Sequence, residues 1–592
     1  MTQYHVTLNG QGYVLDLDRY QKRIREPFAA RQSQGSLAYS DLRGPEQLLV
    51  ISDWAGGEGY IQHDDDHPER WRQGAGLDVY TAPGSLRAGP RFALLSNGPF
   101  DIFSTMQTYG SRIYVGTSQP SIVYWDGSSF GASAAAPSTP SAMAVFLNRL
   151  YAGHAAHLAV QRFDGTTWTA AAFTLPAGAG VSALCTHYRE AAQYLYVAGV
   201  GAGANGVARI YYWDGAVLSS GQFDPEEPTI SAMVVLDERM YVFTADSARR
   251  VGGIYSVDNA GSGGNWAHHL TIAGNAFTAA CLYDEAIYVG TSLDGEVYRW
   301  DGSTLELVKR FGTRATPYSA AIQGMCVWDG ALWVSILDGA GGCGLARFDG
   351  RGWTKPLSGV TGTAPRSLCV FNGELFVSTQ KTGQGQFGRA LPGNYSGTAT
   401  LESGLIDCGL SGISKLFKSV TLVTAALAAS QAVQVEYRLE DTGSWVSLGT
   451  LSTVGATTAT FSFAANITGR QISLRLTLTC TPGGSTTPIV HEVALRYVPR
   501  PSLAREWELA VVLEGTPELP LITLDNGPEP LTGAQLTSAL WSAAGVTGPV
   551  TLVDLDGASY PVYVQDVREE MGKISQRRGY QRLGLVRRVE AA

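Results

Sequence analysis

The chain has 592 residues, of which 70 are glycine, 45% are apolar and only 16% are charged. The apolar fraction supports a large core, and the many glycines without a G-x-y period indicate tight turns between short strands rather than collagen. A net charge of −9 argues against broad nucleic-acid binding, and no apolar run reaches the roughly 18 residues that span a bilayer.

The first 90 residues contain no repeat and little helical pattern. We predict that residues 1–90 form a segment of their own, which wraps around the next domain or docks on a partner. The run HDDDH at residues 63–67 has metal-ligand side chains but lacks turn glycines at fixed positions, so we predict an acidic surface loop and no metal site.

A short apolar–aromatic segment recurs seven times between residues 91 and 399. Its aromatic residues are spaced by 37, 45, 45, 47, 45 and 43 positions, and they are Tyr114, Tyr151, Tyr196, Tyr241, Tyr288, Trp333 and Phe376. A Met, Leu or Ala recurs seven residues before most of these segments, and we expect it in the core of an innermost strand. A repeat of this length is typical of a solenoid or propeller.

Two turn signals divide each repeat into four strands. A pair such as Asp329-Gly330 or Asn372-Gly373 lies before the aromatic strand, and such pairs favour two-residue hairpins. An Asp-Gly turn such as Asp126-Gly127 follows it, and its aspartate is expected to bond nearby backbone. We therefore predict a β-propeller of about seven blades. The seventh repeat lacks its Asp-Gly turn and is expected to close with a strand from elsewhere in the chain.

The repeat ends before residue 400, and two further domains are predicted. Period-two alternation of apolar residues within 400–498 indicates a β-sandwich. Residues 499–592 are predicted as a small α+β docking domain. Its helix is expected to begin at Thr532, with Gln535 bonding back to it, and to have one apolar face formed by Leu536, Leu540, Trp541 and Ala544. The fold class is thus mainly β.

Motifs for catalysis or cofactor binding are missing. We find no nucleophile elbow, Walker loop, HExxH motif or Rossmann glycine pattern, so no catalytic residue, no metal and no cofactor is predicted. The seven cysteines form no CxxC pair and are expected as buried apolar side chains in a reducing compartment. The scattered histidines are expected on the surface or in loops.

The two flanks resemble proteins of tailed bacteriophages. Residues 53–59 (DWAGGEG), preceded by YSDL at 39–42, look like the opening of phage tail-associated proteins. The C-terminal pattern is similar to a domain of phage tail proteins, and it comprises WEL at 507–509, LW at 540–541, LDG at 555–557, YPV at 560–562 and DVRE at 566–569. The predicted sandwich resembles modules found beside that domain. The resemblance implies assembly with other tail proteins and supplies no catalytic residue.

These observations lead to a non-enzymatic structural component of a phage tail, at the baseplate or tail tip. Its expected location is the virion, after synthesis in the host cytoplasm, because no signal peptide precedes residue 10. Its expected partners are other tail proteins in a symmetric assembly and a glycan or protein of the host surface, with neither nucleic acid nor membrane insertion. Candidate docking residues are Asp53, Trp54, Arg577, Arg578, Arg587 and Arg588.

Two other functions remain open from the sequence. One is a lectin-like propeller, with Trp168 and Trp353 as candidate glycan contacts. The other is a polysaccharide hydrolase or lyase. The basic C-terminal stretch also has three readings: a solvated strand face, a docking surface for an acidic neighbour, or a nucleic-acid tail.

Overall fold

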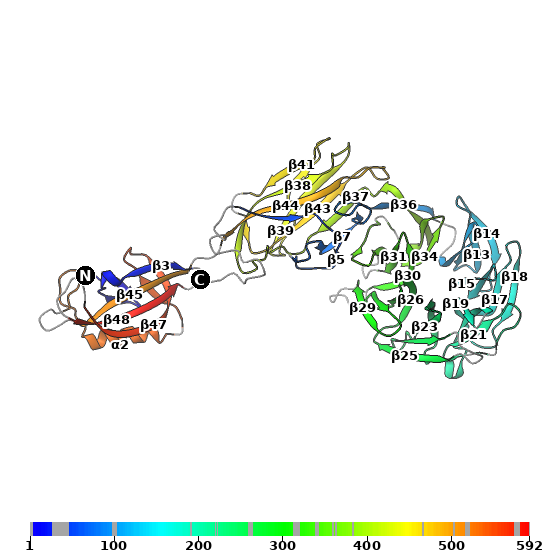
Figure 1. Ribbon diagram of the computed structural model, residues 1–592, viewed down its shortest axis with the longest axis horizontal. Coiled ribbons are helices and arrows are strands. Elements are labelled where there is room, and N and C mark those ends of the chain that lie inside the picture. The colour runs from blue at the N-terminus through cyan, green and yellow to red at the C-terminus, as the bar shows by residue number, and fades with distance from the viewer. Residues whose placement is uncertain are drawn as a thin grey trace.

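The protein consists of three β-rich units that lie in a row (Figure 1). The computed structural model describes residues 4–25, 46–64, 66–97, 103–189, 192–219, 221, 223–258, 265–311, 320–337, 343–357, 360, 364–381, 384–464, 467–500, 504–514, 521–546, 548–573 and 580–590. We call the units the ring, the two-sheet unit and the terminal unit. The mainly β character and the repeated four-stranded sheets confirm the coarse prediction.

The ring is built from small antiparallel sheets that follow one another along the chain. Among the described residues, the first sheet contains β11 (Phe103–Tyr109), β12 (Arg112–Thr117), β13 (Ser121–Trp125) and β14 (Phe130–Ala135), the second contains β15 (Pro140–Phe146), β16 (Arg149–His154), β17 (His157–Phe163) and β18 (Trp168–Thr174), and the third contains β19 (Gly180–Arg189), β20 (Ala192–Val200) and β21 (Arg209–Trp213). The fourth sheet contains β22 (Thr229–Leu236), β23 (Arg239–Ala245), β24 (Val251–Val257) and β25 (Trp266–Ala273), and the fifth contains β26 (Phe277–Tyr283), β27 (Ala286–Thr291), β28 (Glu296–Trp300) and β29 (Leu305–Arg310). The sixth sheet contains β30 (Ala321–Trp328), β31 (Ala331–Leu337), β32 (Cys343–Phe348) and β33 (Trp353–Thr354). A short 3-10 helix, η2 (Ala204–Gly206), follows β20.

The inner hairpins have the turn geometry that their residue pairs favour. Both central residues have positive φ at Asp237-Glu238, Asp284-Glu285, Asp329-Gly330 and Asn372-Gly373. Such turns match the right-handed twist of the flanking strands. The sequence pattern favours Asn148-Arg149 as the turn of the second sheet, but the turn lies one residue earlier, at Leu147-Asn148, because Phe146 pairs with Arg149.

A strand from before the repeat completes the last sheet of the ring. This sheet has the order β10 (Pro90–Asn97), β36 (Gln384–Tyr395), β35 (Glu374–Lys381) and β34 (Ala364–Phe371). Innermost strand β34 packs on β11, and residues such as Ile113 share a core with Phe376, which closes the ring. The expected strand from elsewhere is therefore β10, and its pairing covers an edge that would otherwise be free.

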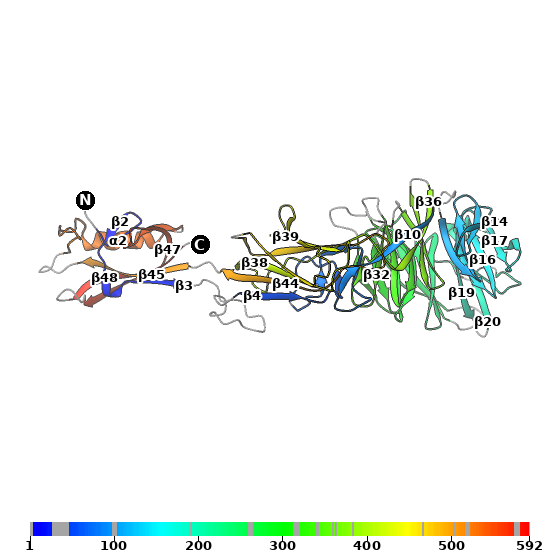
Figure 2. The same cartoon turned by 90° about the horizontal axis from the view of Figure 1, so that it is seen from above.

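The two-sheet unit has one core between two antiparallel sheets. One sheet has the order β40 (Val446–Leu451), β39 (Ala432–Leu439), β43 (Ile472–Thr479), β37 (Thr398–Glu402) and β7 (Gln73–Ala75). The other contains β41 (Thr458–Ser462), β38 (Ser414–Thr424), β44 (Ile489–Arg500), β9 (Leu86–Ala88) and β8 (Leu77–Asp78), with β4 (Gln47–Ile51) on β44 and β42 (Thr468–Gly469) on β38. Figure 2 shows β4 beside β44. A short parallel pair, β5 (Gly57–Glu58) and β6 (Arg70–Trp71), lies next to the ring.

The terminal unit is a seven-stranded sheet with one helix. The strand order is β2 (Gln11–Tyr13), β1 (Val6–Leu8), β46 (Val550–Val553), β47 (Ser559–Lys573), β48 (Tyr580–Glu590), β45 (Ala504–Glu514) and β3 (Gln21–Arg25), with the 3-10 helix η1 (Leu17–Arg19) before β3. Helix α2 (Gly533–Ala544) begins after Thr532, which forms the predicted capping box with Gln535. In the part of the chain that is described, no helix has the length and apolar character needed to cross a membrane.

One residue of the predicted apolar helix face lies outside the core. Leu536 and Leu540 are buried, but Trp541 is 48% exposed and its Nε1 donates to Glu569 Oε1 at 2.8 Å. Position 541 follows Leu540 by about 100° around the helix, which carries it past the edge of the buried stripe. The neighbouring buried position is Ala543.

In place of the single N-terminal segment predicted over 1–90, the structure divides these residues between two units. Strands β1, β2 and β3 belong to the terminal unit, and β4 to β9 belong to the two-sheet unit. The ring is therefore inserted in the two-sheet unit, which is itself inserted in the terminal unit. Both ends of the chain lie in the terminal unit, at the far end from the ring (Figure 1).

Candidate functional site

The DWAGGEG motif lies where the two-sheet unit meets the ring. Asp53 Oδ1 accepts a hydrogen bond from Ala55 N at 3.0 Å and so turns the chain. Trp54 is 3% exposed and packs in the core of the two-sheet unit. In this motif, Asp53 forms a turn and Trp54 fixes the segment in the core, and both precede the glycines. Docking of a partner by Asp53 and Trp54 stays a prediction. The indole of Trp54 contacts the core of its own unit.

The glycines of this motif allow two backbones to touch. A Cβ on Gly57 would lie 2.5 Å from Trp353 N, and a Cβ on Gly352 would lie 2.6 Å from Gly57 N. Gly57 also has φ +81°, a conformation that favours glycine. Residues 56–58 therefore lie directly on the turn between β32 and β33 of the ring. We call this contact the junction.

Glu58 connects the junction to two lysines of the ring. Its side chain is buried, and Oε1 lies 3.1 Å from Lys355 Nζ. Lys309 Nζ donates to the Glu58 carbonyl oxygen at 2.8 Å. Burial lowers the pKa of Lys309, against the opposing effect of the nearby Glu58 carboxylate. A carboxylate and two ammonium groups are thus gathered where the two units meet.

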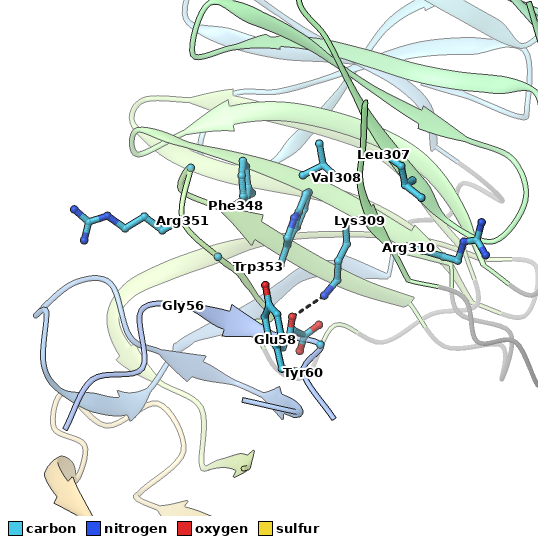
Figure 3. Close-up of a pocket in the computed structure, with 13 residues that line it drawn as sticks. Gly56, Glu58, Tyr60, Leu307, Val308, Lys309, Arg310, Phe348, Arg351 and Trp353 are labelled. Atoms are coloured by element: carbon cyan, nitrogen blue, oxygen red, sulfur yellow. Dashed lines mark hydrogen bonds between the residues drawn. The ribbon is translucent and has the colours of Figure 1, made fainter. Parts of the chain in front are cut away.

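A pocket of about 550 Å³ opens beside these charged groups. Glu58 and Tyr60 line it from the two-sheet unit, and Lys309 and Trp353 line it from the ring (Figure 3). Trp353 is 5% exposed, and its ring stacks on Phe348 with centroids 4.8 Å apart. Trp353, the predicted glycan contact, therefore lines a pocket, and its indole ring is fixed in place by stacking on Phe348.

A second, smaller pocket of about 270 Å³ lies at the same boundary. Tyr80 and Tyr395 line it together with Trp328 of the ring. The guanidinium of Arg347 lies 3.6 Å from the centroid of the Tyr80 ring, a cation–π contact. Burial, with the nearby Asp78 carboxylate, raises the pKa of Tyr80. This contact gives the two units a second point of attachment.

Of the other predicted contact residues, Trp168 and the backbone of Arg587 and Arg588 lie away from the junction. Trp168 is half-buried, stacks on Phe163 with centroids 5.1 Å apart, and donates from Nε1 to Ser133 Oγ at 2.8 Å. Arg577 and Arg578 lie outside the described residues. Arg587 and Arg588 lie on β48, where the backbone of Arg588 pairs with Trp507, and their side chains are not among the described ones.

The Asp-Gly turns have the expected structural role. Asp126, Asp164 and Asp301 each accept hydrogen bonds from the backbone N–H groups two and three residues later. Asp214 and Asp349 do the same. These donors hold the pKa of Asp126 and of Asp164 down to about 2. The carboxylates of these aspartates therefore bind backbone N–H groups of their own turns.

We expect acid to weaken these turns. A carboxylate with a lowered pKa stabilises the folded protein fully above its unfolded pKa of about 4, and this contribution disappears as the pH falls to about 2. Asparagine keeps a turn-forming oxygen without titrating. Melting temperatures across this window should therefore fall less for the double variant Asp126→Asn and Asp164→Asn than for the parent. If the melting temperatures of the double variant and the parent fall in parallel with pH, the result would contradict a stabilising role of the two carboxylates.

Four cysteines occupy equivalent positions on innermost strands. Cys185, Cys281, Cys326 and Cys369 each pair with the repeat's aromatic residue on the next strand. Burial raises the pKa of Cys281 to about 11 and of Cys369 to about 12, so both remain thiols. Over the described residues, no group of three or more His, Cys, Asp or Glu side chains is arranged to hold a metal ion.

The histidine prediction fails at three positions, of which His63, in the run predicted as a surface loop, is 8% exposed. His154 is the last residue of β16 and His187 lies within β19, with 0% and 4% of their surface exposed. Burial lowers the pKa of His154 to about 4. Burial also lowers the pKa of His187, so it favours the neutral form of both side chains.

No family model and no curated protein matches this chain. Three similar solved structures are β-propeller-like proteins. The extracellular domain of BT4673 from B. thetaiotaomicron is 12% identical, with a TM-score of 0.40 over 58% of this chain and 43% of that one. YCF48 from Cyanidioschyzon merolae is 11% identical (TM-score 0.38, 52% of this chain and 100% of that one), and Saccharomyces cerevisiae Sqt1 is 12% identical (TM-score 0.35, 53% and 96%). The chain thus spans less than half of the first of these, and at these TM-scores they carry no conclusion about function.

Proposed function

We propose that this chain is a non-enzymatic structural and interaction component of a bacteriophage tail, at the baseplate or tail tip. In this proposal the ring is a seven-bladed β-propeller, the two-sheet unit is a β-sandwich, and the terminal unit is the docking domain. The starting point is the resemblance of residues 53–59 and of the C-terminal patterns to phage tail proteins.

One structural observation supports this division of roles. Both ends of the chain are in the terminal unit, and the ring is at the opposite end of the row (Figure 1). A terminal unit fixed to a particle would present the ring outward, where repeated copies gain avidity for a host surface. The exposed Trp541 on α2 is an aromatic side chain available for such docking.

Electron microscopy of particles from the producing culture tests the tail assignment. We expect gold-labelled antibody against the ring to gather at one end of tailed particles. As a control, antibody preabsorbed with the purified protein should leave the particles bare. Label on cell envelopes or free in the medium, with bare particles, would refute the assignment.

Carbohydrate binding by the ring is the second candidate function. Trp353 favours it, because this residue lines a pocket, whereas Trp168 is held by Phe163 and Ser133. A polysaccharide hydrolase or lyase has no such supporting observation. A turnover assay on host surface polysaccharide with released oligosaccharide would establish an enzyme and overturn the non-enzymatic proposal.

A further inference from the structure

The junction pocket has hydrogen-bonding atoms that the protein leaves unused. Glu58 and Trp353 are each more than nine-tenths buried. Glu58 Oε2 and Trp353 Nε1 have no hydrogen-bond partner among the described residues. A buried polar atom without a partner is costly, and native proteins rarely keep one without a reason. Both residues line the pocket, so its wall contains one unpaired acceptor and one unpaired donor.

The same pocket has apolar surface and an exposed aromatic ring. Leu307, Val308 and Phe348 line it from the ring. Tyr60 is 38% exposed, and the guanidinium of Arg70 lies 4.6 Å from its ring centroid. Apolar walls with a few fixed polar groups are typical of small-molecule sites, and the volume falls within their usual range of about 300–1,000 Å³.

We propose that the junction pocket binds one saccharide unit, with contacts from both the ring and the two-sheet unit. Glu58 accepts from sugar hydroxyls, while Lys309 and Trp353 donate to ring and hydroxyl oxygens. Tyr60 packs against the C–H face of the sugar. Saccharides alternate hydroxyls with C–H surfaces, and this pattern matches the mixture of groups in the pocket (Figure 3).

The charges in the pocket favour a sugar over an inorganic anion. Lys355 pairs with Glu58 at 3.1 Å, and Lys309 is bonded to the Glu58 carbonyl oxygen. Arg310 pairs with Glu296. Lys355 and Arg310 are therefore paired with carboxylates, and Arg351 extends away from Glu58 and Lys309 (Figure 3). Lys309 uses one of its three N–H donors on a neutral carbonyl, which leaves donors for a sugar oxygen. A free phosphate would also face the Glu58 carboxylate. The inference deepens the carbohydrate-binding candidate, on which it rests, and is independent of the tail assignment.

Saturation-transfer difference NMR on the full chain tests the proposal. The probes are glucose, galactose, N-acetylglucosamine and galacturonic acid, of which the last carries a carboxylate. The Leu307→Trp variant is designed to fill the pocket, because Leu307 is 45% exposed and lines it. The Tyr60→Ala variant removes the exposed ring. Neither variant alters Glu58 or Lys309, which hold the junction together.

Matched controls change similar residues away from the pocket. Val327 is 40% exposed on β30, and Tyr188 is 55% exposed on β19. We expect Val327→Trp and Tyr188→Ala to keep the saccharide signal of the parent. We expect Leu307→Trp to lose it, and Tyr60→Ala to weaken binding by about tenfold, which corresponds to ~1.4 kcal/mol. All four should keep the melting temperature of the parent to within a few degrees.

The outcomes separate the site from the broader function. A signal from any of the four sugars that disappears in Leu307→Trp supports the site. A signal from galacturonic acid alone then identifies an acidic sugar as the ligand. A signal that persists in Leu307→Trp leaves carbohydrate binding in place but overturns this site. No signal from the parent protein overturns both.

Discussion

Replacing Asp554 by alanine is expected to destabilise the terminal unit by about 2–5 kcal/mol, because the Tyr20 hydroxyl and the buried Trp507 N–H lose the acceptor that they share. Asp554 is 3% exposed and receives three side-chain donors: Tyr20 Oη at 2.7 Å, Lys22 Nζ at 2.8 Å and Trp507 Nε1 at 2.9 Å. Burial raises the pKa of Asp554, but these donors outweigh it and hold the pKa below its usual value. The carboxylate thus ties N-terminal and C-terminal strands together.

Hydrogen exchange of the full chain measures this effect in the unit concerned. In Asp554→Ala we expect backbone amides of β45 and β48 to exchange much faster, while those of the ring keep their protection. Asp556→Ala is the matched control. Its carboxylate also lies 3.0 Å from Lys22 Nζ, but its side chain is 50% exposed, and exposed pairs contribute little. Equal effects of the two variants would contradict a central role for Asp554.

Replacing Gly57 by alanine is expected to separate the ring from the two-sheet unit at the junction. The added methyl group would lie 2.5 Å from Trp353 N, closer than real side chains approach backbone. Positive φ at Gly57 adds a strain of about 1–2 kcal/mol for any L-residue with a side chain. We expect a lower melting temperature and, in small-angle X-ray scattering, a larger maximum dimension as the two units move independently.

Gly373→Ala isolates the steric part of this effect. Gly373 has φ +79°, nearly that of Gly57, but its Cβ would have no heavy atom within 4 Å. Both variants therefore carry the same backbone strain, and only Gly57→Ala meets a neighbouring backbone. We expect Gly373→Ala to keep the scattering profile of the parent. Matching profiles for the two variants, both unlike the parent, would show that strain alone accounts for the effect.

Features with short-range causes were predictable from the sequence. The pairs at Asp284-Glu285 and Asp329-Gly330 are adjacent residues, and their turns have the expected positive φ. The aromatic repeat was visible because each unit of 37 to 47 positions carries the same short local pattern. The capping box at Thr532 is equally local. The closing strand of the seventh sheet was expected because the seventh repeat lacks its Asp-Gly turn, although the sequence did not identify β10 as that strand.

Long-range pairing could not be predicted in the same way. Val6 pairs with Tyr13 nearby, but Thr7 pairs with Val553, more than 500 residues away, and no pattern in either strand specifies that partner. The candidate site was missed for the same reason, since Glu58 meets Lys309 only in the folded chain. One available signal was the match between two glycine-rich segments, residues 56–59 and 350–352, since close backbone contacts need glycine on both sides.

The insertion of one unit within another sets an order for maturation during synthesis. The ring can close once residues 90–395 are available, whereas β1 and β3 must wait for β46 and β45, which lie more than 475 positions further along the chain. Domains emerge from the ribosome in sequence order, and pairing across such distances is slow. A chain that stops before residue 504 can therefore hold a complete ring but no terminal unit. If the particle is assembled through the terminal unit, truncated chains would be excluded from it, because they lack the unit that docks.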